Sequence, residues 1–361
     1  MYKTYFLIYI FIVTIFTVQG QQSYYQLYEG PIHADTLVML FHAIDQQVWG
    51  VMYTKEPIAA STNLKYIEFE GDITEQGQLN LKMAGKDDIV FTGTFKKGEI
   101  NGSFVTENQN IRLKSNNDNH AVKFKIINQS ASSELFPGKE GTPVALIELI
   151  FIFPERNTRP MLWDSFKTFN SSSDEKNNFD EKELILKNMN SFFDQYAETR
   201  NITNDGGFSF QWNKSVRGSI VFTNNDLVCL KNSYYVFTGG AHGMQNHAYG
   251  IFLSENGFQL LPDLLFTENY RKELSVILTN TLKQSIGLPE EKSLSSEGYF
   301  VDLVEPNDNI YLTPSGIGFY YNSYEIAPYS TGHTNIFISF DKIYHLINTE
   351  YKTFFDPNIQ F

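Results

Sequence analysis

Three stretches of the chain decide the fold: residues 234–243 (YYVFTGGAHG), 260–266 (LLPDLLF) and 320–333 (YYNSYEIAPYSTGH). The first is an aromatic strand that runs into a glycine turn, and the second is a leucine-rich segment that precedes a predicted helix. The third lies within residues 311–340, among further predicted strands. Together they predict strands, tight turns and helices in the C-terminal part of the chain.

The glycine turn is the first candidate binding element. Gly239, Gly240 and Gly243 permit a tight turn and a close backbone approach, and such a turn can present N–H groups to an anion. The turn lacks the spacing of a dinucleotide loop and the lysine of a P-loop. The alternative is a sharp strand–strand turn in which His242 is hydrogen-bonded to its neighbours.

A tyrosine-rich segment is the second candidate. Tyr324 and Tyr329 lie close in sequence to Glu325 and Gly332, and tyrosine offers a large contact area with a polar tip. This composition suits a recognition surface. A tyrosine-rich strand in a sheet core has the same composition without any partner, so both interpretations stay open. The predicted ligand-binding residues are Gly239, Gly240, His242, Tyr324, Glu325, Tyr329 and Gly332.

Catalytic and metal sites have weaker support. His242, His247, His333 and Asp263 are a conceivable metal set, but no HExxH or other metal signature is present. No GxSxG elbow supports a serine nucleophile, and the sequence cannot select a pair of glycosidase carboxylates among many. We predict no catalytic residue, no metal and no cofactor.

The C-terminal half alternates strands with helices, which predicts an α+β layer arrangement. Asp180 and Glu183 form a capping-box pair before a helix whose apolar stripe faces a core. Thr267 is the predicted N-cap of a second helix that ends at Gly287, and Asp341 the predicted cap of a last one. Strands are predicted at residues 144–154, 207–212, 215–223, 228–238, 247–254, 310–313, 316–321 and 335–339.

Short strands and Gly-containing turns fill the region before residue 113 and predict a meander of β-hairpins. The stretch from residue 130 to 143 is rich in Ser, Gly and Pro, which favours a domain boundary there. The predicted division is a signal peptide at residues 1–20, a β-rich domain at 21–135 and an α/β domain at 141–361.

Residues 2–20 have the pattern of a secretory signal, with Lys3 before an apolar run that is short for a membrane span. An uncleaved anchor is the alternative and the one predicted route to membrane contact. The formal net charge of −13 argues against a nucleic-acid partner, which needs a basic patch. Cys229 is the single cysteine, so no intramolecular disulfide forms, and its apolar neighbours indicate a buried side chain.

Residues 238–242 (TGGAH), 261–264 (LPDL) and 324–329 (YEIAPY) with Gly332 resemble, in this order, the RsiV-like/PdaC-like extracytoplasmic domain family. The resemblance covers residues 144–347, although Gly243 stands where the family often has proline. It implies an antiparallel sheet with packed helices, outside the cytoplasm. RsiV-like members bind lysozyme, and in PdaC-like members the domain accompanies a separate catalytic domain.

These observations lead to one main hypothesis and two alternatives. The main one is an exported, non-enzymatic module in the periplasm or on the surface of a bacterium. Its partner would be a basic, lysozyme-like protein or peptidoglycan. The first alternative is an enzyme that modifies cell-wall polysaccharide, or its accessory domain, with or without a metal. The second is a structural or assembly protein of the envelope.

Overall fold

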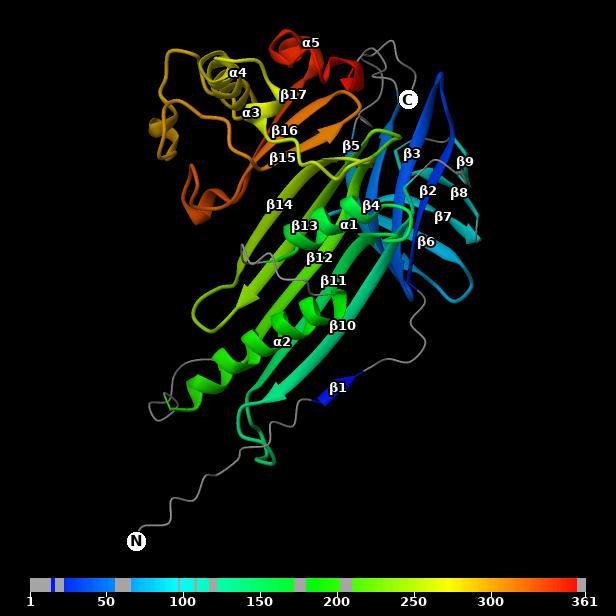
Figure 1. The fold of residues 1–361 in the computed structure, drawn as a ribbon, viewed down its shortest axis with the longest axis vertical. Helices are drawn as coiled ribbons and strands as arrows, with labels where there is room; N and C mark the ends of the chain where they lie inside the picture. The colour runs from blue at the N-terminus through cyan, green and yellow to red at the C-terminus, as the bar shows by residue number, and fades with distance from the viewer. Residues whose placement is uncertain are drawn as a thin grey trace.

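A closed β-barrel packs beside a helix-covered sheet in this chain (Figure 1). The computed structural model describes residues 14–16, 23–55, 66–96, 98–106, 109–116, 122–171, 180–201 and 210–355. Strands outweigh helices, and the helices lie in the second part of the chain. The predicted α+β class is therefore confirmed.

The N-terminal hairpins form an eight-stranded barrel in which each strand pairs antiparallel with the next. The ring closes where Tyr28 of the first strand lies opposite Ser115 of the last. The predicted meander is thus confirmed, while its closure depends on residues too distant in sequence to be read from local patterns. The strands are β2 (Ser23–Ile32), β3 (Asp35–Ile44), β4 (Gln47–Thr54), β5 (Tyr66–Ile73), β6 (Gln78–Met83), β7 (Ile89–Lys96), β8 (Glu99–Phe104) and β9 (Ile111–Ser115).

Alternate residues of β3 belong to two different hydrophobic cores. Met39 and Phe41 point into the barrel, where the Phe41 ring stacks on Phe95 with centroids 5.5 Å apart. Val38 and Leu40 point outward and pack into the core shared with the sheet. Because side chains alternate along a strand, β3 is buried on both faces and joins the barrel to the rest of the molecule.

The main sheet has six strands in the order β1-β10-β11-β12-β13-β14. We predicted an antiparallel sheet, but β11 and β12 run parallel, so the sheet is mixed. The physical reason is that the connection between them contains two helices, and a crossover of this kind returns the chain in the same direction. The strands are β1 (Thr14–Phe16), β10 (Phe124–Glu134), β11 (Val144–Pro154), β12 (Trp212–Thr223), β13 (Leu227–Phe237) and β14 (Met244–Leu253).

The hydrogen-bonded sheets divide the chain earlier than the boundary that we placed between residues 135 and 141. Strand β10 pairs with β11 from Phe124 to Glu134, so the Ser-, Gly- and Pro-rich stretch begins within this strand and only residues 135–143 form the loop of a hairpin. The change from barrel to sheet falls between β9 and β10. Most of the predicted signal peptide lies outside the described residues; residues 14–16 pair with residues 130–132 of β10.

Two helices cover one face of the main sheet, α1 (Pro160–Phe169) and α2 (Glu181–Glu198) (Figure 1). The capping box predicted at Asp180 and Glu183 is present, and the apolar stripe of α2 is buried as predicted. Helix α1, which begins with Pro160, was not predicted. No helix within the described residues has the length and apolar character needed to cross a membrane.

A three-stranded antiparallel sheet and further helices complete the C-terminal part (Figure 1). Two predicted caps were wrong: α4 begins after Asn269, which has φ 69°, and α5 begins after Ser339, which places Asp341 in the first turn. The residue before α4 needs a positive φ, which asparagine tolerates and a β-branched residue such as threonine does not. The elements are α3 (Pro262–Leu265), α4 (Tyr270–Ser285), β15 (Ile310–Thr313), β16 (Gly316–Tyr321), β17 (Thr334–Ser339) and α5 (Phe340–Ile343).

Candidate binding cleft

The face of the main sheet opposite the helices carries a lattice of polar side chains, which we call the polar face. Polar residues occupy alternate positions along most of β12, β13 and β14, so these residues point to one side of the sheet. The strand register places them in three rows across the sheet. The rows are Ser215–Tyr235–Gln245, Arg217–Ser233–His247 and Ser219–Lys231–Tyr249.

The barrel lies against one end of the polar face and is fastened there by buried polar contacts. The indole N–H of Trp49 donates to the carbonyl of Gly218 at 3.0 Å. Lys231 Nζ lies 2.5 Å from Glu68 Oε2 of β5, and the Lys231 side chain is only 10% exposed. Because a buried charge is stable only when it is paired, this contact fixes where β5 stands over the sheet.

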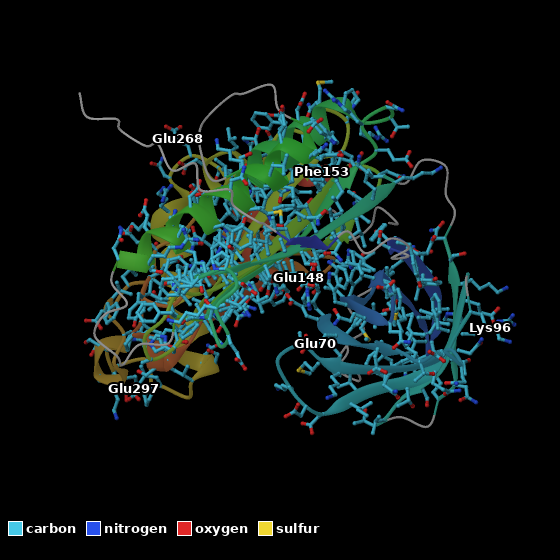
Figure 2. All side chains as sticks on the ribbon, turned by 90° about the horizontal axis from the view of Figure 1, so that it is seen from below. Glu70, Lys96, Glu148, Phe153, Glu268 and Glu297 are labelled. Atoms are coloured by element: carbon cyan, nitrogen blue, oxygen red, sulfur yellow. The ribbon has the colours of Figure 1, made fainter. Side chains whose placement is uncertain are left out.

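Between barrel and sheet is a cleft of about 650 Å³, which we call the barrel–sheet cleft. Figure 2 shows Glu70 on the barrel and Glu148 on the sheet on either side of it, and both residues line the cleft. A groove of about 420 Å³ continues it across β10, β11 and β12 and shares Glu148, Ser215 and Tyr235 with it. The concave surface is therefore long rather than round.

Two histidines line the cleft and are neutral at physiological pH. Burial is the main cause that lowers the pKa of His247 to about 2, and the nearby charge of Lys231 lowers it further. Burial also lowers the pKa of His333. His247 Nδ1 is 2.9 Å from Ser233 Oγ, whereas His333 Nδ1 has no hydrogen-bond partner among the described residues. Both rings can thus hydrogen-bond a ligand without adding charge.

The predicted glycine turn and tyrosine segment come together at one end of β14. The His242 ring stacks on Tyr329 with centroids 3.9 Å apart, and the Tyr329 hydroxyl donates to the Gly243 carbonyl at 3.0 Å. His242 Nδ1 is 3.0 Å from the same carbonyl, in agreement with the alternative that this histidine bonds a neighbour. Gly239 and Gly240 have φ of 95° and 93°, so this turn does use conformations that favour glycine.

Tyr324 stands out from this cluster toward solvent. Its side chain is 53% exposed and its ring centroid lies 5.9 Å from that of Tyr329. Its φ of 73° is unusual for a residue with a bulky side chain, and such conformations concentrate at functional sites. We call His242, Tyr324 and Tyr329 the aromatic rim.

Glu325 and Gly332 shape the loop that carries the rim. Glu325 accepts hydrogen bonds from the side-chain amides of Asn322 and Asn307, at 3.1 and 3.2 Å. Asn322 in turn accepts the His247 backbone N–H at 2.7 Å, which ties the loop to β14. Gly332 ends a short 3₁₀ turn with φ 78°. All seven predicted binding residues thus lie on the two loops that form and support the rim.

The rim adjoins the barrel–sheet cleft. A Cβ atom added to Gly243 would lie 2.5 Å from the Tyr235 ring, so the turn packs directly on a tyrosine that lines the cleft.

The four residues considered from the sequence as a metal site make other contacts in the structure. Asp263 accepts hydrogen bonds from Tyr270 and Arg271, and His242 faces Tyr329. Among the described residues, no group of three or more His, Cys, Asp or Glu side chains is suited to hold a metal.

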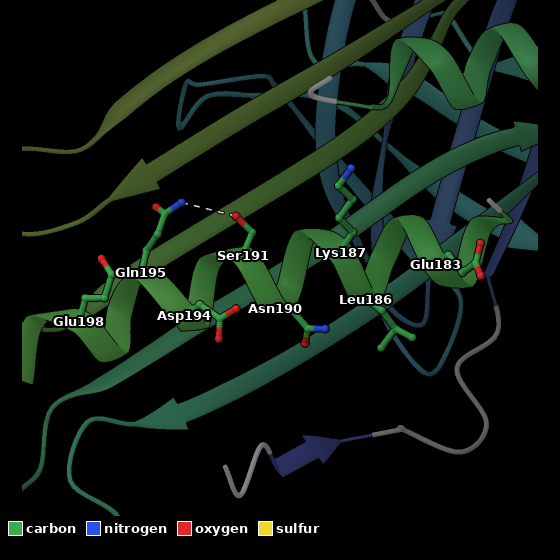
Figure 3. Close-up of a pocket in the computed structure, with 8 residues that line it drawn as sticks. All are labelled: Glu183, Leu186, Lys187, Asn190, Ser191, Asp194, Gln195 and Glu198. Carbon is green, nitrogen blue, oxygen red and sulfur yellow. Dashed lines mark hydrogen bonds between the residues drawn. The ribbon is translucent and has the colours of Figure 1, made fainter. Parts of the chain in front are cut away.

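A second concave surface lies on the outer side of α2 and is shallow. Figure 3 shows Glu183, Lys187, Ser191 and Glu198 along one exposed face of the helix, with Gln195 donating to Ser191 at 3.4 Å. The residues on this face repeat at helical spacing, and Glu183 also closes the capping box with Asp180. We regard it as the solvated side of α2.

Sequence reasoning missed the polar face. The alternation Lys231-x-Ser233-x-Tyr235 is visible in the sequence, but it was interpreted only as a strand. The barrel side of the cleft had no local signal, because Glu68 meets Lys231 across 163 residues of chain. Cys229, by contrast, is buried as predicted, and burial raises the pKa of its thiol to about 12.

Comparison with known proteins supports the resemblance seen in the sequence. Residues 157–245 match the family model of the deacetylase PdaC, and residues 263–341 match that of a protein family of unknown function, DUF3298. No curated protein matches the chain. The barrel residues that form one wall of the cleft lie outside both matched regions.

Two solved structures are similar to this chain. A DUF3298 family member from Bacteroides fragilis is 24% identical over 64% of this chain and 95% of its own, with a TM-score of 0.57, which shows a shared fold. A DUF3298 family protein from Pseudomonas aeruginosa is 15% identical over 63% of this chain and 95% of its own, with a TM-score of 0.46. The two family matches, at residues 157–245 and 263–341, together with the shared fold, support a PdaC/DUF3298-like domain in this part of the chain.

Proposed function

We propose that this protein is an exported binding module of a bacterial cell envelope, and that the barrel–sheet cleft and its aromatic rim hold a wall glycan. The observation that carries the proposal is the composition of the cleft. Aromatic side chains such as Trp49, Tyr235 and Tyr320 alternate there with serines and neutral histidines. Sugars need flat apolar surfaces for their C–H faces and many hydrogen-bonding groups for their hydroxyls, and this lining offers both.

The dimensions of the cleft also suit a chain-like ligand. Its volume of about 650 Å³ lies in the range of small-molecule sites, and the adjoining groove extends it along the sheet. The aromatic rim, which adjoins the cleft, adds the exposed ring of Tyr324 as a further apolar surface. Export is supported by the apolar N-terminal segment and by the PdaC-like family, whose members act outside the cytoplasm.

A basic protein of the lysozyme type is the second candidate. The formal net charge of −13 favours it, because an acidic surface attracts a basic partner and accelerates association. Such a partner would contact the aromatic rim, since exposed tyrosines are frequent anchors in protein interfaces.

The test is binding of the purified protein to purified peptidoglycan and to c-type lysozyme, at low and at physiological salt. We expect saturable peptidoglycan binding that persists at physiological salt. Lysozyme binding that persists there would favour the second candidate, whereas binding lost with salt reflects nonspecific attraction. No binding to either partner would refute the proposed function.

Variants of the rim locate the site. Replacing His242 and Tyr324 together with alanine removes two of the three rim rings, and we expect affinity to fall about tenfold or more. The matched control is Phe258→Ala, because Phe258 is 47% exposed and follows the other end of β14. If the double variant folds and binds as well as the control, the rim is not part of the site.

A further inference from the structure

Arg217 is a positive charge on the polar face that forms no ion pair with any described residue. It occupies the middle row, with Ser233 and His247 next to it in register. Its guanidinium lies 5.5 Å from the centre of the Trp49 ring, and the residue lines the barrel–sheet cleft. No carboxylate of the described residues forms an ion pair with it, whereas Lys231 in the next row is paired with Glu68.

The cation–π contact with Trp49 leaves the N–H donors of Arg217 without a partner among the described residues. A cation–π contact uses the charge of the guanidinium and none of its N–H groups, and no described residue accepts a hydrogen bond from the Arg217 side chain. Those donors form a fork that matches the two oxygens of a carboxylate. The Ser215 and Ser233 hydroxyls on the same face offer further hydrogen bonds to the group held there.

We infer that the barrel–sheet cleft recognises a ligand with a single carboxylate, which Arg217 binds through its guanidinium fork. This inference rests on the proposed glycan-binding function and adds the chemistry of one ligand group. The carboxylate is single because Glu70 and Glu148 line the same cleft and would repel a polyanion along its length. An otherwise uncharged chain with one acidic substituent fits this arrangement.

The test compares probes that differ in one carboxylate. The first is the disaccharide of N-acetylglucosamine and N-acetylmuramic acid, whose lactyl group is acidic, and the second is neutral di-N-acetylchitobiose. A third probe, N-acetyl-D-alanyl-D-alanine, carries its carboxylate on a peptide. Calorimetry would measure the binding of each probe to the wild-type protein, to Arg217→Gln and to Arg217→Lys.

We expect the acidic disaccharide to bind the wild type more tightly than the neutral one. Arg217→Gln should lower the affinity for the acidic sugar about tenfold or more, and leave that for the neutral sugar unchanged. Arg217→Lys keeps the charge without the fork and should give an intermediate loss. The control is Arg156→Gln, since Arg156 also stacks on a tryptophan, Trp163, but on the helix side of the sheet.

Each remaining outcome has a definite meaning. If only the dipeptide binds in an Arg217-dependent way, the carboxylate is recognised but belongs to a peptide. If acidic and neutral sugars bind equally and Arg217→Gln affects neither, the inference is wrong while the proposed function stands. If no probe binds, the inference is wrong, and the binding of purified peptidoglycan decides whether the proposed function stands. Unchanged thermal unfolding of the variants separates these results from misfolding.

Discussion

His42 shows how one buried side chain fastens the barrel to the sheet. It lies on β3 with no exposed surface. Its Nε2 accepts the backbone N–H of Ile220 on β12 at 3.0 Å, so its Nδ1 carries the proton and donates to the Trp49 carbonyl at 3.1 Å. Only the neutral ring can accept the Ile220 N–H, because the imidazolium has no acceptor.

This geometry predicts acid sensitivity. Burial lowers the pKa of His42 from 6.5 to about 3, so below pH 6.5 the unfolded chain binds a proton that the folded protein does not. The stability that His42 contributes is complete above that pH and is lost as pH falls toward about 3. We expect the free energy of unfolding to fall by up to about 1.4 kcal/mol per pH unit from this group.

Urea unfolding at several values between neutral pH and about pH 5 measures that slope. In His42→Gln the slope should be smaller by His42's share, while His247 continues to contribute in the same direction. An exposed histidine, His345, provides the control variant His345→Gln. An unchanged slope in His42→Gln would mean that the ring accepts a proton in the folded state.

At this scale the sequence predicts little of the geometry. His42 follows an apolar run and carries no motif, and its acceptor role depends on Ile220, 178 positions away. The rim was easier to predict from the sequence. Glycine favours the positive φ that Gly239 and Gly240 adopt, so the two residues indicate a turn. That His242 would stack on Tyr329 follows only from the packing of two loops distant in sequence.

Helix α2 shows the opposite case, in which local chemistry defines an element. Asp180 accepts the Glu183 backbone N–H at 2.9 Å, and Glu183 accepts the Asp180 backbone N–H at 3.2 Å. Each bond satisfies a backbone group that the helix leaves without a partner, so the start of the helix is encoded within four residues.

Replacing Asp180 with alanine removes this cap, and we expect a loss of about 1 kcal/mol in the free energy of unfolding. Chemical denaturation measures the loss. Asp194→Ala is the control, because Asp194 is exposed on the same helix and does not cap it. Equal losses in both variants would show that the cap makes no specific contribution to the stability of the helix.

Other elements were harder to predict for identifiable reasons. Helix α1 has Leu162, Trp163 and Phe166 buried at helical spacing, but it is short and follows directly after a long apolar strand. The start of α4 at Asn269 departs from the usual cap residues with extended backbone, so the pattern favoured Thr267. The parallel pairing of β11 with β12 depends on where the two helices return the chain.

At the scale of the whole molecule, the barrel covers part of a sheet face that would otherwise be open. The sheet face supplies Arg217, Lys231 and His247, which lie in or beside the family-matched regions, and the barrel adds Trp49 and Glu68. Neither part alone encloses the cleft. A binding site at such a junction depends on how firmly the two parts are joined.

We predict that barrel and sheet unfold as one cooperative unit. Outward residues of β3 and β4 share the core of the sheet, and the Trp49 and His42 hydrogen bonds cross the same boundary. Phe91 lies inside the barrel with no exposed surface and belongs to the barrel core alone. Phe91→Ala should therefore destabilise the whole protein by about 3–5 kcal/mol, the cost of a large cavity.

Hydrogen exchange under native conditions tests this coupling, because it reports the opening free energy of each element separately. We expect Phe91→Ala to lower protection in β13, on the sheet, as much as in β4, on the barrel. Val105→Ala, at an exposed position just after the barrel strand β8, should change neither. If only barrel amides lose protection, the two parts are independent units, and the cleft between them can open without unfolding the sheet.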